Sequence, residues 1–118
     1  MSNYGYYLPL HPNTFETARF IGIAPKTEGF GPDEKQKADK SGTPIWVVSA
    51  LVKMAGGVQE MENFTLTAPV EVVNKIKVIE ELAPIRLVGL AGGKWSPLQA
   101  DKTNWTFQIS GIELIKAQ

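Results

Sequence analysis

Lysines and aromatic residues in two glycine-containing segments are the side chains of this sequence best suited to chemistry. The first segment, residues 26–43, is rich in Gly, Pro, Asp and Lys, and the second starts at residue 91 with Ala-Gly-Gly-Lys-Trp-Ser-Pro. The candidate residues are Lys26, Phe30, Lys35, Lys37, Lys40, Lys94 and Trp95. Single-stranded nucleic acids are held by cations that follow the phosphates and by flat rings that stack on bases. The two segments therefore predict such a contact, provided that folding brings them to one groove.

Two strand-borne arginines, Arg19 and Arg86, extend this candidate set, because either side chain could project from an open sheet face toward a phosphate. A structural ion pair is an equally good interpretation of each arginine. The lysines of the first segment also have an alternative, a plain solvated loop, since Glu28, Asp33, Glu34 and Asp39 nearly cancel their charge. For Trp95 the alternative is an indole that folds back over the end of the β-barrel predicted below, as a lid.

Catalytic residue types are scarce. The chain has one histidine, His11, and no cysteine, which excludes a two-histidine metal site and cysteine nucleophiles and argues against a histidine-based triad. The carboxylate pairs Glu60/Glu62 and Glu80/Glu81 have the spacing of a solvated strand face and a helix surface. The glycine pairs at 56–57 and 92–93 lack the Gly-Lys-Ser/Thr that a phosphate loop needs. We therefore expect no enzyme, no cofactor and no metal site.

Composition indicates one globular domain. A chain of 118 residues with 43% hydrophobic and 20% charged residues is ordinary for such a domain. The formal net charge of zero argues against a strong, sequence-blind phosphate binder, so that any such binding depends on where the charges lie. There is no apolar run long enough to cross a bilayer and no secretion signal at the N-terminus. These features predict a cytoplasmic protein without membrane contact.

The order of the predicted elements indicates the fold class. Hydrophobic patterning predicts strands at 17–24, 44–53 and 58–67, a helix at 71–82, and strands at 85–90 and 104–115. This β-β-β-α-β-β series predicts a mostly β fold with one helix, a small five-stranded OB-fold-like barrel over residues 17–118. Residues 1–16 would form an N-terminal arm. A rival interpretation makes 72–79 another strand.

Details of the last elements refine this scheme. Val72, Ile76, Ile79 and Leu82 recur at helical intervals, and Pro84 is expected to end the helix. In the final strand the apolar face changes near Gly111, which predicts a bulge of the kind that small barrels need to close. In an OB barrel the first and fourth connections flank the ligand face, and these connections carry the two lysine-bearing segments.

Four short motifs carry a family resemblance: Gly-Thr-Pro-Ile-Trp-Val-Val at 42–48, Phe-Thr-Leu-Thr-Ala-Pro at 64–69, Ala-Pro-Ile-Arg-Leu-Val-Gly-Leu at 83–90, and Phe-Gln-Ile-Ser-Gly-Ile at 107–112. With Trp95, this ordered set resembles small proteins carried by plasmids, integrative elements and phages of Gram-positive bacteria. Some of these are replication or excision accessory proteins, and some resemble OB-fold single-strand binders. The resemblance implies a role in the replication or transfer of mobile DNA and supplies no catalytic residue.

Two functions follow from the sequence. The leading hypothesis is a single-stranded DNA-binding accessory protein of a mobile genetic element with little sequence specificity, for which RNA is an alternative ligand. The competing hypothesis is a non-enzymatic protein–protein adaptor or assembly subunit on the same barrel, with a protein partner or a second copy of the chain. The competing hypothesis explains the zero net charge directly.

Overall fold

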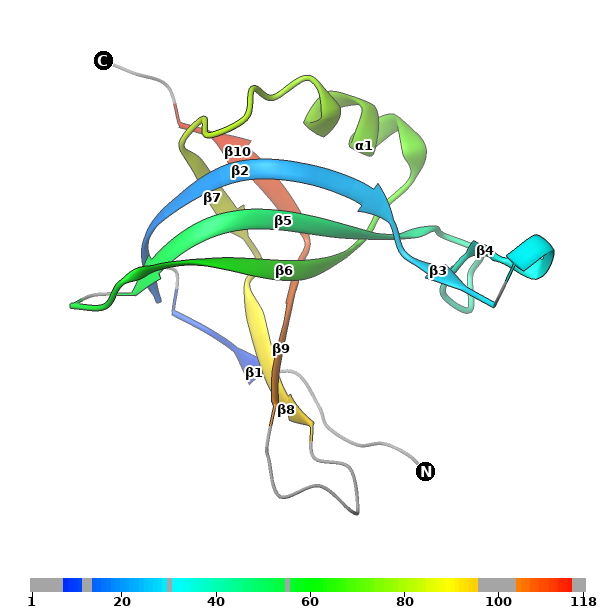
Figure 1. The fold of residues 1–118 in the computed structure, drawn as a ribbon, viewed down its shortest axis with the longest axis horizontal. Helices are drawn as coiled ribbons and strands as arrows, with labels where there is room; N and C mark the ends of the chain where they lie inside the picture. The colour runs from blue at the N-terminus through cyan, green and yellow to red at the C-terminus, as the bar shows by residue number, and fades with distance from the viewer. Residues whose placement is uncertain (1–7, 12–13, 30, 55, 96–103, 116–118) are drawn as a thin grey trace.

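The computed structural model describes residues 8–11, 14–29, 31–54, 56–95 and 104–115, and these residues form a mostly β fold with one α-helix (Figure 1). The strands are β1 (Leu8–Pro9), β2 (Phe15–Pro25), β3 (Thr27–Glu28), β4 (Lys35–Gln36), β5 (Ile45–Met54), β6 (Gln59–Thr67), β7 (Ile85–Val88), β8 (Ala91–Trp95), β9 (Asn104–Ile109) and β10 (Gly111–Leu114). The helices are α1 (Val70–Lys77) and a short 3-10 helix at Gly31–Asp33. The predicted β class with one helix is confirmed.

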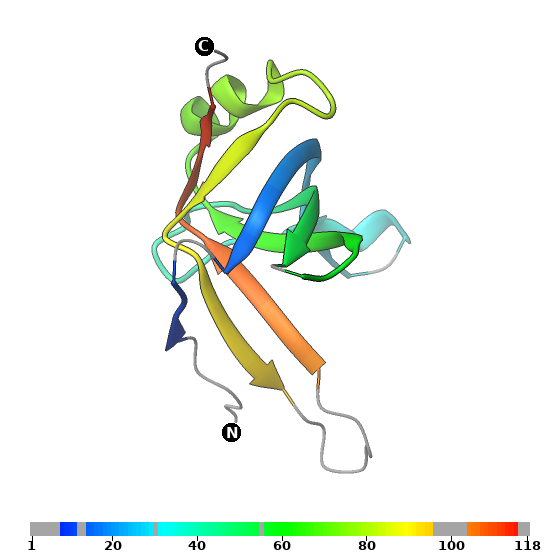
Figure 2. The same cartoon turned by 90° about the vertical axis from the view of Figure 1, so that its left-hand side faces the viewer.

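The strands form mixed sheets that do not close into a barrel. Six strands make one sheet in the order β1-β8-β9-β6-β5-β2, while β7 pairs with β10 and β3 pairs with β4. Every pairing is antiparallel except that of β6 with β9, which is parallel. Figure 2 shows β7 and β10 on one side of the molecule and β2, β5 and β6 on the other.

Strand β5 organises the fold because both of its edges are paired, with β2 and with β6. Its β-branched and aromatic residues favour extended backbone, and every second side chain is buried: Trp46, Val48, Ala50 and Val52. The strand predicted at 44–53 is thus confirmed as a central strand. Trp46 is a core residue, and its indole N–H donates to the Ala68 carbonyl at 2.9 Å.

The core lies between the β2-β5-β6 side and the β7-β10 side, with α1 covering one end. Phe64, Leu66, Val48, Val73 and Ile85 have their side chains fully enclosed. Phe64 also packs edge-on against Phe15, with ring centroids 5.9 Å apart, and lies 5.7 Å from the ring of Phe107. Burial of large apolar side chains is the main stabilising contribution in a domain of this size.

The first predicted strand is longer than expected and changes face. Strand β2 begins at Phe15, inside the segment predicted to be an N-terminal arm. Its register with β5 is irregular between Phe20 and Gly22. Because the extra residue at this irregularity reverses the alternation, Ile23 packs against the core together with Ala18 and Phe20.

The helix is shorter than predicted. It ends at Lys77 rather than at residue 82, and its buried residues are Val73 and Ile76, while Val72 is exposed. Valine and isoleucine propagate a helix poorly. The following residues bond to β2 instead, since the Leu82 N–H donates to the Phe20 carbonyl at 2.6 Å. Leu82 adopts a left-handed φ of 71° at this turn.

The C-terminal half contains two corrections to the predicted elements. Residues 91–95, predicted to begin a loop, form strand β8, which pairs with β9 and with β1. The strand predicted at 104–115 is broken at Ser110 into β9 and β10, close to the bulge predicted near Gly111. Ser110 lies so close to Gly89 that a Cβ atom there would meet its hydroxyl group, and Gly89 has a φ of +65°. Glycine is therefore required at residue 89.

Candidate nucleic-acid interface

The outer surface of β5 and β6 lies near the predicted residues, and we call it the front face; its β5 side chains are half-buried and most of its β6 side chains are exposed. Strict alternation along the two strands places ten side chains on it: Ile45, Val47, Ser49, Leu51 and Lys53 from β5, and Gln59, Met61, Asn63, Thr65 and Thr67 from β6. At its centre the Ser49 hydroxyl donates to the Asn63 side-chain oxygen at 2.8 Å. The front face carries one cation and no carboxylate, a composition suited to an anionic ligand.

The acidic residues of β6 occupy the opposite surface of the sheet. Glu60 and Glu62 alternate with Met61 and Asn63, so both carboxylates point away from the front face. Partial burial raises the pKa of Glu62, the negative charge of Glu60 raises it further, and a hydrogen bond from the Asn63 backbone opposes the shift. Placing both carboxylates behind the sheet keeps their negative charge off the front face.

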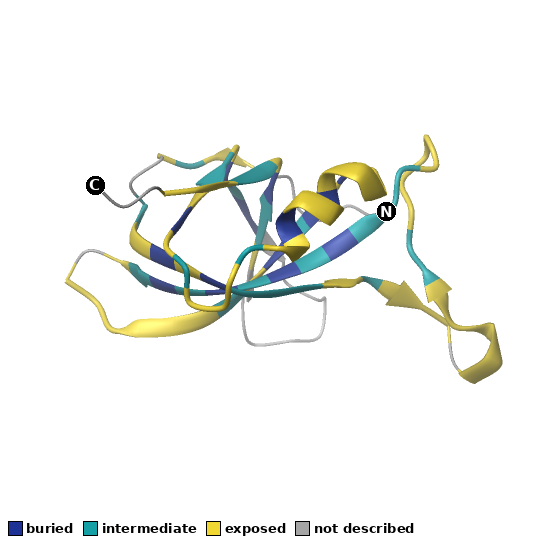
Figure 3. Ribbon diagram, turned by 90° about the horizontal axis from the view of Figure 1, so that it is seen from above, coloured by how far each residue is buried: buried dark blue, intermediate teal, exposed yellow. Residues whose placement is uncertain are grey.

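A hairpin-like projection borders one end of the front face, and we call residues 26–44 the β3–β4 arm. It was predicted to be a long connection without regular structure, but its described residues are ordered by main-chain hydrogen bonds. The Lys26 N–H donates to the Ile45 carbonyl at 3.0 Å, and the Lys37 N–H donates to the Lys26 carbonyl at 2.7 Å. Figure 3 shows the arm extending beyond the sheet with most of its residues exposed.

Two acidic residues of the arm hold its own backbone and side chains together. Asp39 Oδ1 accepts the N–H groups of Ser41 and Thr43, each at 2.9 Å, and Glu34 Oε2 accepts the Thr27 hydroxyl at 2.9 Å. The lysine side chains of the arm form no ion pair with these carboxylates, because the only ion pair among the described residues joins Arg86 and Glu113. Lys35 and Lys40 are exposed, while Lys26 and Lys37 are half-buried. Their ammonium groups are therefore available to an external anion.

The predicted lysine-bearing segments lie at two borders of the front face rather than side by side. The arm projects beyond one end of β5 and β6, and the β8–β9 hairpin, which carries Lys94 and Trp95, projects in another direction (Figure 1). Figure 2 shows both projections on the side of the front face. The side chains of Lys94 and Trp95, and the whole of Phe30, lie outside the described part of the structure.

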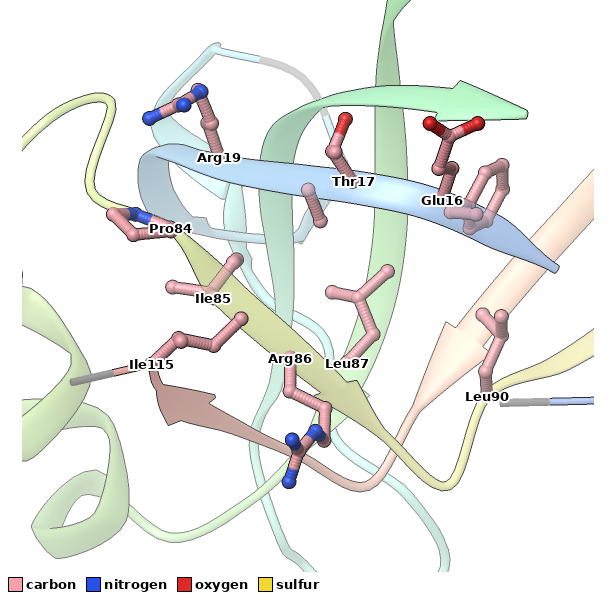
Figure 4. Close-up of a pocket in the computed structure, with 11 residues that line it drawn as sticks. Glu16, Thr17, Arg19, Pro84, Ile85, Arg86, Leu87, Leu90 and Ile115 are labelled. Carbon is pink, nitrogen blue, oxygen red and sulfur yellow. The ribbon is translucent and has the colours of Figure 1, made fainter. Parts of the chain in front are cut away.

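The two predicted arginines line one pocket of about 270 Å³ between β2 and β7, although their side chains leave it in opposite directions (Figure 4). The Arg19 guanidinium donates to the Leu82 carbonyl at 3.0 Å, and Arg86 lies 3.3 Å from Glu113. Both side chains are exposed and have a local partner. The structural ion pair that the sequence left open is present for Arg86, whereas Arg19 is held by a hydrogen bond to a backbone carbonyl instead.

Stacking residues are missing from the described part of the front face. The aromatic side chains that the structure describes, Phe15, Phe20, Trp46, Phe64 and Phe107, all pack in or against the core. The polar centre of the front face, Ser49, Asn63 and Thr65, was not selected from the sequence. The alternation of Glu60 and Glu62 with these uncharged residues was the signal that could have identified it.

Other classes of site find no support in the described residues. They contain no group of three or more His, Asp or Glu side chains that could hold a metal ion. Their helices are too short to span a lipid bilayer.

Comparison of the chain with protein-family models, with curated proteins and with solved structures found no significant match. The front face and the arm must therefore indicate the ligand by their own chemistry.

Proposed function

We propose that this chain is a single-stranded DNA-binding protein of low sequence specificity, built on an open, OB-like arrangement of strands. The strand order β2-β5-β6-β9, with the helix between β6 and β7, supports this likeness. The Phe20 N–H donates to the Ala83 carbonyl at 3.0 Å and links β2 to the segment leading into β7. This link brings the first long strand, β2, next to the segment that follows the helix, as in a five-stranded, partly open Greek-key barrel.

The observation that carries the proposal is that a sheet surface without carboxylates lies beside an arm that bears four lysines. The front face bears no carboxylate, and it borders an arm whose lysines have no ion-pair partner in the described residues. In OB barrels the second and third strands and the flanking loops bind oligonucleotides, and β5, β6 and the β3–β4 arm are the corresponding elements here.

In this mechanism the arm lysines contact consecutive phosphates while the polar centre of the front face contacts sugars and bases. Phe30 and Trp95, which belong to the two lysine-bearing segments of the sequence, are the residues that we propose to stack on bases, each stack being worth about 1–3 kcal/mol. The zero net charge predicts modest affinity, in the nonspecific range of about 10⁻⁴–10⁻⁶ M at physiological salt. An accessory role in mobile DNA is the part of the proposal that depends on the family resemblance.

The test is a titration of fluorescein-labelled oligo-dT with the protein, followed by anisotropy at several salt concentrations. If the four arm lysines each neutralise one phosphate, the logarithm of the binding constant falls with the logarithm of salt with a slope of about −2.8. A double variant, Lys35→Ala with Lys40→Ala, should make the slope less steep, from about −2.8 to about −1.4. It should also weaken binding about 25-fold at 0.1 M salt.

Lys75→Ala is the matched control, because Lys75 is an exposed lysine on α1, away from the front face. This control should bind oligo-dT as the wild type does. Equal losses of oligo-dT affinity in the control and in the arm variant would show general electrostatic attraction rather than binding by the arm. A wild-type binding constant that does not change with salt would contradict phosphate binding altogether.

The adaptor hypothesis has separate support on the far side of the molecule. Apolar side chains are exposed around α1 and β10, among them Val78 at 79% and Leu114 at 53%. Exposed apolar clusters of this kind mark protein contacts more often than nucleic-acid contacts.

A further inference from the structure

Within the part of the chain that the structure describes, strand β10 has one unpaired edge. Among the described strands it pairs only with β7, in a register that places Glu113 opposite Arg86. The Ile115 N–H donates to the Pro84 carbonyl at 3.0 Å, which fixes the residues whose main-chain groups face β7. Since these groups alternate along an antiparallel ladder, the N–H and C=O groups of Ile112 and Leu114 point away from β7. No backbone hydrogen bond to another described residue satisfies them.

An apolar groove of about 590 Å³ runs beside this edge, between β10 and α1. Figure 2 shows β10 next to α1, with β7 on the other side of the strand. The helix supplies Val72 and Ile76, the residues after it supply Val78 and Ile79, and β10 supplies Ile112 and Leu114. A free strand edge next to an apolar helix face provides both main-chain hydrogen bonds and side-chain pockets.

We propose that this groove binds an extended peptide segment of a partner protein, which adds to β10 as a strand and has alternating apolar and basic residues. The free N–H and C=O groups of Ile112 and Leu114 select extended main chain over a helix. Side chains opposite Ile112 and Leu114 would face the groove and must be apolar. The side chain opposite Glu113 would lie on the other surface, where Glu113 is 62% exposed, and a basic residue complements it.

Charge argues against a second copy of the chain as the occupant. If two β10 strands paired through Ile112 and Leu114 about a two-fold axis, Glu113 would stand directly opposite its own copy. Like charges directly opposite each other on neighbouring strands are destabilising. A partner strand with lysine or arginine opposite Glu113 avoids that repulsion and gains an attraction instead.

This peptide site is separate from the front face, so it adds a function to the proposed DNA binding rather than restating it. A protein that binds single-stranded DNA on one side and a strand of a partner on the other would bring that partner to the DNA. The two sites fail independently, because variants of β10 leave the front face unchanged.

The experiment uses ¹⁵N-labelled full-length protein and a synthetic blocked peptide of alternating valine and lysine, titrated to about 1 mM, a concentration that detects weak binding. In the free protein the amides of Ile112 and Leu114 should exchange rapidly with solvent, while the Glu113 amide is protected by β7. With peptide, the first two amides should become protected at least tenfold and Glu113 should change little. Unchanged exchange of Ile112 and Leu114 at the highest concentration would overturn the proposal.

Two controls identify the interaction. The same peptide with N-methyl groups on alternate residues keeps its side chains but loses the amides that would face β10, so its affinity should fall at least tenfold; equal binding would overturn a strand-addition mode. Glu113→Lys should reverse the preference toward an alternating valine–glutamate peptide, and an unaltered preference would overturn the assigned charge pairing. Concentration-dependent dimerisation that protects the same amides without peptide would show a second copy as the occupant and overturn the proposed partner.

Discussion

The front face and the groove beside α1 are both exposed, but they leave different groups available to a ligand. Strands β5 and β6 are paired with each other and with outer strands, so the front face presents side chains that are uncharged except for Lys53. It borders lysines that have no ion-pair partner among the described residues. The groove presents apolar side chains and the unpaired edge of β10. The first surface therefore suits an anionic strand, and the second suits a polypeptide held by main-chain hydrogen bonds and apolar contacts, whose binding depends less steeply on salt.

The largest effect is expected from removing a side chain on which both surfaces depend. Phe64→Ala deletes a ring with no exposed surface that packs on Phe15 and Phe107. Such a cavity in a core costs about 3–5 kcal/mol of unfolding free energy. Urea denaturation measures this loss, and both DNA and peptide binding should weaken with it. A loss below about 1 kcal/mol would show that the core is not shared in this way.

A smaller change should separate the two surfaces. Asn63→Asp adds a negative charge to the centre of the front face without altering shape, and it keeps the oxygen that accepts the Ser49 hydroxyl. Repulsion of a phosphate about 5 Å away should cost roughly 1 kcal/mol, which is about fivefold in oligo-dT affinity at low salt. Anisotropy titration checks this value, and peptide binding should stay the same.

Asn74→Asp on α1 is the matched control for that change, since Asn74 is an exposed asparagine on the other side of the molecule. It should leave oligo-dT affinity unchanged. If both substitutions weaken DNA binding equally, the front face has no special role.

The pH dependence of stability tests the arrangement of carboxylates behind the front face. Because burial and Glu60 raise the pKa of Glu62 above its ordinary value of 4.5, the folded protein holds this proton more tightly than the unfolded chain does. The contribution of Glu62 to stability should therefore decline as pH rises from 4.5 through the raised pKa. Glu62→Gln should remove this decline in urea-denaturation curves recorded across pH, and a decline that persists in the variant would assign it to another group.

The smallest effect is expected at the pocket between β2 and β7. Arg86→Ala removes an ion pair whose partners are 66% and 62% exposed, and such pairs contribute about 0–1 kcal/mol. Urea denaturation should show a loss of unfolding free energy close to zero, and oligo-dT affinity should be unaltered. A clear loss of DNA affinity would restore Arg86 as a phosphate contact.

Predictability from sequence differed between regions for physical reasons. The strands at 44–53 and 58–67 were predictable because β-branched and alternating residues make strong local patterns, and their pairing is a hairpin. The predicted helix was too long because Ile79 and Leu82 continue its apolar period, whereas main-chain bonds to β2 determine the backbone conformation there. Strand β8 was missed because Ala91, Gly92 and Gly93 have low strand propensity and are extended through pairing with β9.

The candidate site was predictable in part. Composition identified the lysines of the β3–β4 arm. The conformation of the arm was not predictable, because it depends on hydrogen bonds such as those to Asp39, which no periodic pattern reveals. The free edge of β10 was also hidden, because it follows from the break at Ser110, which gives β9 and β10 different partners. Pairing between distant segments decides such features, and local sequence does not encode it.

The most direct measurement is a map of backbone amide shifts in ¹⁵N-labelled protein titrated with oligo-dT. If the front face binds DNA, the amides of Ser49, Asn63 and Thr65 and those of the arm lysines should shift together, while Ile112 and Leu114 stay in place. Shifts confined to α1 and β10, or no shifts at oligonucleotide concentrations up to about 10⁻⁴ M, the weak end of nonspecific binding, would contradict DNA binding at this face.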